Sequence, residues 1–218
     1  MLLIERVVVG PLMSNAYLVF DNVKGEGILI DAGDDSEKII ETVEKNKIRV
    51  KAIYATHGHF DHVLAVGEIK DYFECKFYIH REDLPILEKA AESCKKLLGR
   101  DYSNPPNPDG YIKDGDKITV GEYEIKVMHT PGHTPGSVSY LSKDAVFTGD
   151  TLFAGAVGRY DFPGGNLEQL LDSLKKLLKL PDSFSVYPGH GPSTTIGVEK
   201  VHNPFIGERG LYRLNEKR

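Results

Sequence analysis

Residues 56–62, Thr-His-Gly-His-Phe-Asp-His, hold four candidate metal ligands within six positions. They directly follow a short apolar run with the pattern of a buried strand, so the ligands leave a sheet on the loop at its C-terminal end. Alternate side chains of an extended loop point the same way, and His57 and His59 can therefore close on one ion. Asp61 and His62, displaced from them, can serve a second ion. Imidazoles suit zinc and iron, and the carboxylate adds charge compensation for a divalent ion.

The competing interpretation of this stretch is a polar surface loop with satisfied histidines. For a lone histidine that interpretation would be favoured by roughly 10 to 1, because few histidines are ligands. Three histidines and one aspartate in the spacing H-x-H-x-D-H reverse those odds. We therefore interpret residues 56–62 as a metal-binding loop.

Three further motifs place a candidate ligand on a loop after a predicted strand. His133 lies within Thr-Pro-Gly-His-Thr-Pro-Gly, Asp150 ends Phe-Thr-Gly-Asp, and His190 lies within Tyr-Pro-Gly-His-Gly. Each is weak evidence alone, since a turn role for Asp150 outweighs metal binding by roughly 3 to 1. Together with residues 56–62 they make five histidines and two aspartates. That inventory is what a two-metal site with one shared carboxylate and open positions requires.

The remaining histidines carry less weight. His129 is close to His133 but lies at the end of a strand pattern rather than in the glycine turn, so it is only a spare candidate. His80 and His202 are interpreted as polar residues at the ends of elements.

The apolar patterns indicate which elements position these loops. Strands are predicted at 2–9, 16–20, 27–30, 51–55, 76–79, 117–120, 123–128, 137–141, 144–148 and 184–187. Helices are predicted at 36–47, 63–73, 82–98 and 167–178, with Ser36 and Asn166 as N-caps and a leucine stripe facing the core in the last helix. Residues 99–116 are predicted to form a long loop. The order of elements indicates a layered α/β protein with its sheets inside, and one domain over residues 1–218.

Composition bounds the function. The chain has 218 residues, 40% of them hydrophobic and 27% charged, which is ordinary for a globular protein. A net charge of -5 without a long basic run argues against a nucleic-acid partner. No signal peptide or bilayer-spanning run is recognised, so we expect a cytoplasmic protein without a membrane partner. Cys75 and Cys94 lack ligand spacing and are expected to be reduced, with Cys94 in the core. The oligomeric state stays open.

The ligand motifs resemble those of the metallo-β-lactamase superfamily, and within it the chain looks most like the small hydrolases of the glyoxalase II-like (hydroxyacylglutathione hydrolase-like) group. The resemblance runs nearly end to end, from Asn-Ala-Tyr-Leu-Val at 15–19 to the tail at 195–205. The motifs are highly specific for the superfamily and much less so for the substrate. The resemblance implies an α/β fold, namely a four-layer αβ/βα sandwich with the metals at one edge of the two sheets.

The same resemblance assigns the ligands and the chemistry. It implies a first ion on His57, His59 and His133, a second on Asp61, His62 and His190, and Asp150 as the bridge. The cofactors would be two divalent ions, Zn²⁺ first, with Fe or Mn as alternatives. Asp61 and Asp150 would be the catalytic carboxylates around a hydroxide that bridges the metals. A thioester suits this machinery, because a thiolate with a pKa near ~8.5 leaves without full protonation.

Substrate contacts are expected in the segment 158–165, which follows Asp150. Arg159 stands near where glyoxalase II enzymes place a cation for glutathione, and Tyr160 is expected beside it as a second substrate contact. A surface Arg159 paired with Asp161 is an equally weighted interpretation, since such pairs are common. Only about 28 residues follow His190, fewer than the helical extension of glyoxalase II enzymes needs, and Gly-His-Gly-Pro replaces their Gly-His-Glu-Tyr. These departures count against glutathione and not against hydrolysis.

Three alternatives stay open. A persulfide dioxygenase with a single iron shares the H-x-H-x-D-H loop and a Gly-Arg-x-Asp-Phe segment, here residues 158–162, although it has Pro-Ala-His-Asp where this chain has Pro-Gly-His-Gly. A lactone or ester hydrolase of the same superfamily would use the same ligands. A binding module without catalysis is disfavoured, because it would have no need of all seven ligands.

Overall fold

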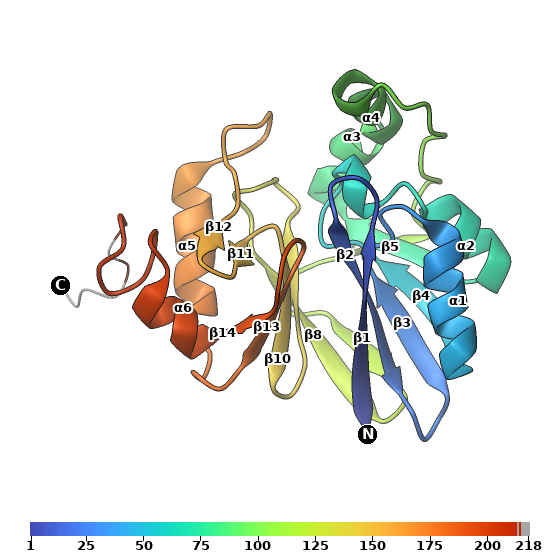
Figure 1. The fold of residues 1–218 in the computed structure, drawn as a ribbon, viewed down its shortest axis with the longest axis horizontal. Helices are drawn as coiled ribbons and strands as arrows, with labels where there is room; N and C mark the ends of the chain where they lie inside the picture. The colour runs from blue at the N-terminus through green and yellow to red at the C-terminus, as the bar shows by residue number, and fades with distance from the viewer. Residues whose placement is uncertain (213, 215–218) are drawn as a thin grey trace.

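Two six-stranded sheets form the centre of the computed structural model, which describes residues 1–212 and 214 (Figure 1). Residues 213 and 215–218 of the expected domain lie outside the described residues. The first sheet has the strand order β1 (Leu2–Val9), β2 (Ser14–Asp21), β3 (Glu26–Ile30), β4 (Arg49–Tyr54), β5 (Lys76–His80) and β6 (Gly110–Ile112). The second has the order β14 (Thr194–Thr195), β13 (Ser185–Pro188), β10 (Ala145–Gly149), β9 (Val138–Leu141), β8 (Tyr123–His129) and β7 (Lys117–Val120).

Strand β2 shows why the sheets lie inside, because all of its residues are buried. Successive side chains of a strand point to opposite faces. Leu18 and Phe20 pack into the cluster under the helices of the first sheet, whereas Tyr17 and Val19 pack into the cluster between the two sheets. A strand buried on both faces is therefore the inner layer of a sandwich.

Helices cover the outer face of each sheet (Figure 1). The first sheet is covered by α1 (Ser36–Asn46) and α2 (Val66–Phe73), and the second by α5 (Leu167–Leu177) and α6 (Ile196–His202). Helix α4 (Ala90–Leu98) lies at the end of the first sheet and packs against residues 60–62 (Figure 1). The leucine stripe of α5 is buried against the second sheet, and Asn166 caps that helix by accepting a hydrogen bond from the Gln169 N–H at 3.0 Å. The expected four-layer αβ/βα sandwich is confirmed. The described residues contain no helix with the length and apolarity to cross a bilayer.

Pairing between strands brings the candidate ligand loops to one edge. Parallel pairing of β3 with β4 sets Ile30 opposite Tyr54, so the residues after both strands are neighbours. Parallel pairing of β10 with β13 sets Gly149 opposite Pro188 in the same way. A single bridge between Ser14 and His190 joins the two sheets at this edge.

Several predicted boundaries were wrong. The helix predicted at 82–98 is a 3₁₀ turn η2 (Arg81–Asp83), a short α3 (Leu84–Leu87) and α4, because Lys89 leaves the helical conformation at φ -105°, ψ 8°. The predicted loop 99–116 contains β6, whose residues pair with the edge of β5. The N-cap of α1 is Asp35 rather than Ser36, and Asp35 makes no side-chain capping bond.

Other elements are smaller than predicted or were not predicted. Helix α2 begins at Val66 after the 3₁₀ turn η1 (Phe60–His62), not at residue 63. Helix α6 and the hairpin β11 (Leu152–Phe153) with β12 (Ala156–Val157) were missed, since each is too short to show a period. Cys75 and Cys94 are free and buried, as expected for core packing.

Candidate metal centre

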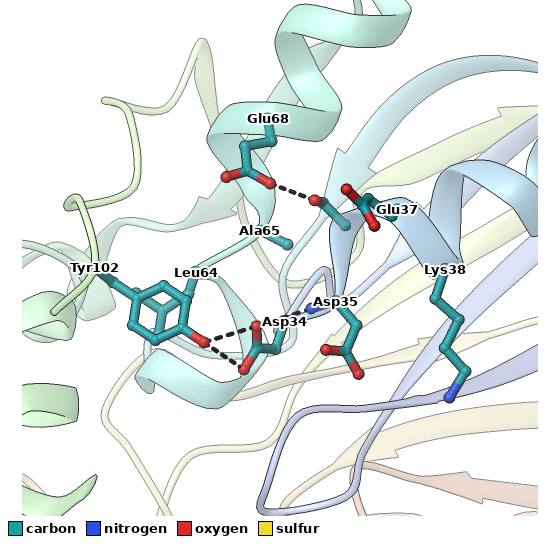
Figure 2. A pocket seen from close by; sticks show the side chains of 9 residues that line it. Asp34, Asp35, Glu37, Lys38, Leu64, Ala65, Glu68 and Tyr102 are labelled. Atoms are coloured by element: carbon teal, nitrogen blue, oxygen red, sulfur yellow. Dashed lines mark hydrogen bonds between the residues drawn. The ribbon is translucent and has the colours of Figure 1, made fainter. Parts of the chain in front are cut away.

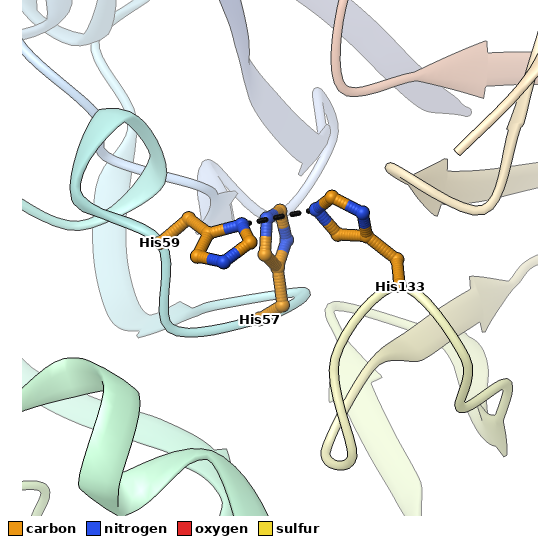
Figure 3. A group of neighbouring side chains, drawn as sticks. All are labelled: His57, His59 and His133. Atoms are coloured by element: carbon orange, nitrogen blue, oxygen red, sulfur yellow. Dashed lines mark hydrogen bonds between the residues drawn. The ribbon is translucent and has the colours of Figure 1, made fainter. Parts of the chain in front are cut away.

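Three histidines from two distant loops meet at the edge of the sandwich (Figure 3). His57 and His59 come from the loop after β4, and His133 comes from the loop between β8 and β9. The Nδ1 atom of His59 lies 3.0 Å from the Nε2 atom of His133, and one ligand atom from each of the three rings lies within 4.8 Å of the others. The spacing in the sequence paired His57 with His59, the family resemblance added His133, and the fold brings the three rings together.

A second group is formed by Asp61, His62 and His190, whose ligand atoms also lie within 4.8 Å of one another. The Oδ2 atom of Asp61 lies 3.1 Å from Nε2 of His190 and 3.5 Å from Nε2 of His62. Its carboxylate also accepts a hydrogen bond from the Ser14 hydroxyl at 2.9 Å. Ser14 was not singled out in the sequence, because a serine at a strand end carries no signal of its own.

Asp150 lies between the two groups. Its Oδ2 atom is 3.5 Å from Nε2 of His133 in the first group and 3.6 Å from Nε2 of His190 in the second. Its Oδ1 atom is 3.5 Å from Nε2 of His62. The carboxylate therefore lies between the two ligand groups, within 3.6 Å of a ring nitrogen from each.

Hydrogen bonds orient the histidines from behind. His133 donates through Nδ1 to the carbonyl of Arg159 at 2.7 Å, and His190 donates through Nδ1 to the carbonyl of Leu12 at 3.1 Å. A ring that donates through Nδ1 keeps a lone pair on Nε2. The Nε2 atom of His133 lies 3.0 Å from Nδ1 of His59, and that of His190 lies 3.1 Å from Oδ2 of Asp61.

Asp31 orients two more rings and was missed as a functional residue in the sequence. Its carboxylate accepts from Nδ1 of His62 at 2.9 Å and from the Thr56 hydroxyl at 2.8 Å. Since that hydroxyl donates to Asp31, it accepts from Nδ1 of His57 at 3.0 Å. The available signal was an aspartate ending an apolar strand next to the strand that carries the ligand loop.

The electrostatics differ between the two groups. Burial and the neighbouring ring of His133 lower the pKa of His59 to about 4, and burial also lowers the pKa of His57, so these two residues of the first group favour the neutral imidazole. Burial lowers the pKa of His62, but the carboxylates of Asp61 and Asp150 outweigh it and raise that pKa to about 10. Burial raises the pKa of Asp61, and the neighbouring His62 and His190 hold it below its usual range nonetheless. The second group therefore favours positive charge at its centre.

The donor set fits divalent ions. Two buried atoms of the cluster, Nε2 of His57 and Oδ1 of Asp150, have no hydrogen-bond partner. Unpartnered buried polar atoms are rare in folded proteins and indicate a missing ligand or ion. Gly189 is required here, because a Cβ atom at that position would lie 2.2 Å from Oδ1 of Asp150. Imidazole and carboxylate donors converging from separate loops suit zinc, iron or manganese.

A cavity of about 360 Å³ opens beside the cluster. The polar part of its wall includes His133, Asp150, Arg159 and His190. The apolar part consists of Phe153, Ala154, Val157, Phe162 and Pro192. Three of the predicted ligands, His133, Asp150 and His190, thus face a space large enough for a small substrate.

The two predicted substrate contacts lie in different places. Arg159 lines the cavity, but its guanidinium is paired with Asp161 at 2.9 and 2.7 Å and lies 4.0 Å above the ring of Phe162. Tyr160 is outside the lining of the cavity as the described residues form it, and its hydroxyl is 3.5 Å from that of Tyr212. The ion pair between Arg159 and Asp161, which the sequence offered as the alternative to a substrate contact, is therefore present in the structure.

The molecule has a second cavity and a further His/Glu group, and both differ from this site. A cavity of about 330 Å³ between α1 and α2 is acidic, but two of its carboxylates are engaged, Asp34 by the hydroxyl of Tyr102 and Glu68 by Ser36 (Figure 2). His80 and His129 lie close to Glu82, yet their rings are stacked at 14° with centroids 4.4 Å apart. Lone pairs in parallel ring planes cannot converge on one ion, which agrees with the minor roles expected for both histidines.

Residues 9–190 match the family described as the Metallo-beta-lactamase superfamily, and the chain belongs to this superfamily. Members of the superfamily are mostly hydrolytic metalloenzymes. The αβ/βα sandwich and the His/Asp cluster therefore agree with the comparison, and both indicate a metalloenzyme of the metallo-β-lactamase superfamily.

Relatives are similar over almost their whole length. An uncharacterized protein of Aquifex aeolicus (strain VF5) is 44% identical, with 95% of this chain and 98% of that protein covered. The probable metallo-hydrolase YqgX of Bacillus subtilis (strain 168) is 37% identical, with 93% and 96% covered. The hydroxyacylglutathione hydrolase GloC of Haemophilus influenzae is 35% identical, with 94% and 99% covered.

Solved structures show the same fold. The B3 metallo-beta-lactamase BLEG-1 has a TM-score of 0.87 at 37% identity, with 93% of this chain and 99% of that chain covered. TTHA1623 in a di-iron-bound form has a TM-score of 0.86 at 41% identity, with 93% and 100% covered. ETHE1 from Myxococcus xanthus has a TM-score of 0.77 at 29% identity, with 99% and 92% covered.

Proposed function

We propose that the protein is a binuclear metallohydrolase that cleaves a small acyl thioester. The observation that carries the proposal is the position of Asp150 between two three-residue ligand groups. His57, His59 and His133 would hold one ion, and Asp61, His62 and His190 the other. Zn²⁺ is the first choice, and the di-iron form of TTHA1623 supports iron as the alternative.

The chemistry divides between the ions and the chain. When bound, the ions would supply Lewis acidity and a water acidified to a pKa of about 7. The chain's own part is to aim the Nε2 atoms of the imidazoles, which the hydrogen bonds to Asp31 and to the carbonyls of Arg159 and Leu12 do. The carboxylates of Asp61 and Asp150 would balance the charge of the ions.

The cavity supports a small substrate with an apolar part. Phe153, Val157 and Phe162 present apolar surface beside the ligands, and burial of such surface contributes roughly 25 cal/mol per Å². Arg159 is neutralised by Asp161, so the cavity has little net charge to attract an anionic carrier. This arrangement favours small acyl thioesters over recognition through a glutathione carboxylate.

Thioesters are chosen over other acyl compounds on two grounds. The titratable groups at the cluster are ligands or partners of ligands, so a leaving group that needs no proton is favoured, and thiolates meet this condition. The relative named hydroxyacylglutathione hydrolase supports the same class. The relative BLEG-1, a B3 metallo-beta-lactamase, makes cyclic amides the control substrates.

The test is thiol release, measured anaerobically with metal-loaded protein. The panel holds hydroxyacyl-glutathione, acyl thioesters of a small neutral thiol, a lactone and a β-lactam. We expect turnover of thioesters, with the rate rising to a plateau at an apparent pKa near ~7. Faster turnover of the lactone or the β-lactam than of every thioester would contradict the assignment of substrate class.

A persulfide dioxygenase is the second candidate, because residues 158–162 match its Gly-Arg-x-Asp-Phe segment and because iron occupies the related TTHA1623. It differs in needing oxygen and one iron. Turnover that requires both oxygen and a persulfide, in protein holding one iron per chain, would replace the hydrolase proposal.

A further inference from the structure

Asp83 is a fully buried carboxylate outside the ligand set, with 0% of its surface exposed. It follows β5 and stands at the N-cap position of α3, yet its side chain makes no capping bond to that helix. An aspartate at an N-cap ordinarily accepts from the first turn of its own helix. Here the carboxylate is directed elsewhere.

The carboxylate accepts three hydrogen bonds from the two loops that carry the first histidine group. Its Oδ2 atom accepts from the N–H of Gly58 at 2.8 Å and from the hydroxyl of Thr134 at 2.7 Å. Its Oδ1 atom accepts from the N–H of Gly136 at 2.6 Å. Gly58 lies between His57 and His59, and Thr134 follows His133.

The glycines show independently how tightly this contact is built. A Cβ atom at Gly58 would lie 2.9 Å from the carbonyl oxygen of Asp83. A Cβ atom at Gly136 would lie 2.7 Å from both the backbone nitrogen and Oδ1 of Asp83. Real Cβ contacts are longer than this, so both loops approach Asp83 as closely as a backbone can.

We infer that Asp83 is the positioning residue of the first ion site, holding the loop of His57 and His59 in register with the loop of His133. This inference rests on the proposed metal centre. The three rings come from segments 74 residues apart, and Asp83 is the carboxylate that bonds to both segments. Ligands must be held within a fraction of an ångström of their productive geometry, so the carboxylate acts on affinity through the backbone of both loops.

The second ion site is held by other bonds. Ser14 donates to Asp61, and His62 donates to Asp31. Asp83 makes none of these contacts, so its loss affects the first site selectively. A residue that merely stabilised the fold would weaken both sites together.

The test is Asp83→Asn, with Glu82→Gln as the matched control. The asparagine keeps the volume but has one acceptor oxygen, and its NH₂ group would face at least one of the three donors. Glu82 is an exposed carboxylate on the same turn, so its variant makes the same change of charge at the surface. The probe is Zn²⁺ alone, titrated against a chromophoric chelator. His59→Ala and His190→Ala identify which binding phase belongs to which site.

We expect Asp83→Asn to lose about 10- to 100-fold in affinity in the phase that His59→Ala removes, and less than threefold in the phase that His190→Ala removes. Glu82→Gln should bind as the wild type does. Equal weakening of both phases, or no weakening, would overturn the inference. If Asp83→Asn does not fold, Thr134→Val removes one of the three bonds and is judged by the same criterion, with a smaller selective loss expected.

The same titration separates this inference from the proposed function. A wild-type chain without two Zn²⁺ phases would refute the binuclear centre and the inference with it. Two wild-type phases with an unselective Asp83→Asn would refute the inference alone.

Discussion

The Nε2 atoms of His62 and His190 face each other at 3.3 Å, although 128 residues of chain separate them. Each ring donates through Nδ1 to an acceptor behind it, His62 to Asp31 and His190 to the carbonyl of Leu12. Two Nε2 atoms this close repel each other unless positive charge, a proton or a metal ion, lies between them, and the raised pKa of His62 shows that this position favours positive charge. The arrangement therefore gains stability when a cation is bound.

The first prediction follows from that repulsion. Zn²⁺ at a free concentration of 100 times its dissociation constant should raise the free energy of unfolding by about 2.7 kcal/mol for each site. Thermal unfolding in chelator and in buffered Zn²⁺ measures the shift, and elemental analysis should give two ions per chain. A loaded and active sample with one ion per chain would contradict the binuclear site.

Asp150→Ala should weaken both sites, whereas His190→Ala should weaken mainly the second. The reason is that Asp150 lies beside ligands of both groups and offsets the mutual repulsion of two dications. Chelator competition on both variants measures the two affinities. Retention of two ions and of activity by Asp150→Ala would exclude the bridge.

Gly189→Ala should damage the centre although it adds one methyl group. The new Cβ would lie 2.2 Å from Oδ1 of Asp150 and 2.8 Å from Cε1 of His62, so the ligands must move. Gly67→Ala is the control. Gly67 lies in helix α2, and a Cβ atom there would lie 3.7 Å from its nearest neighbour, a carbon of Pro106, which is an ordinary contact. We expect Gly189→Ala to lose at least tenfold in metal affinity. Gly67→Ala should instead raise the free energy of unfolding by about 0.5–1 kcal/mol.

Arg159 and Asp161 should have opposite effects on an anionic carrier. Arg159→Ala removes the cation, so the KM for a glutathione thioester should rise. Asp161→Asn frees the guanidinium of Arg159 from its partner, so the same KM should fall. The change should be a few-fold, since an exposed pair contributes about 0–1 kcal/mol. Thioesters of a neutral thiol are the control and should respond to neither variant. An unchanged KM for both carriers would leave Arg159 as a surface residue.

His80 should make the chain less stable in acid. Burial and the nearby His129 lower the pKa of His80 in the folded chain, while the unfolded chain keeps about 6.5. The unfolded chain therefore binds more protons, and the contribution of His80 to stability is present above pH 6.5 and is lost as the pH falls from there toward the folded pKa. His80→Asn keeps an acceptor for the Glu82 N–H and does not titrate. Urea unfolding from pH 7.5 to 5 should give a shallower decline for the variant, and parallel curves would refute this role.

The sequence was informative where a ligand follows a strong local signal. The loop 56–62 could be placed at a strand end because an apolar run precedes it, and the stripe of α5 has a clear helical period. The grouping of His133, Asp150 and His190 came from the resemblance. Their meeting depends on which strands pair, and spacing along the chain does not encode pairing.

The errors have a common physical cause. Strand β6 exists because the edge of β5 offers unpaired backbone groups, and the helix predicted at 82–98 breaks near a carboxylate that is bonded to two other loops. Asp31 and Asp83 were missed as functional residues for the same reason. Isolated aspartates look like caps or turns until their partners from distant segments are known.

The bridge between Ser14 and His190 at the seam of the two sheets has a consequence for how the metal is chosen. Because ligands come from both sheets, neither ion site is complete until contacts distant in sequence have formed, and such contacts form slowly. An ion that needs the complete proposed ligand set would therefore bind only after these contacts have formed. Because imidazole and carboxylate ligands accept several divalent metals, we expect the identity of that ion to follow the supply of metals around the folding chain.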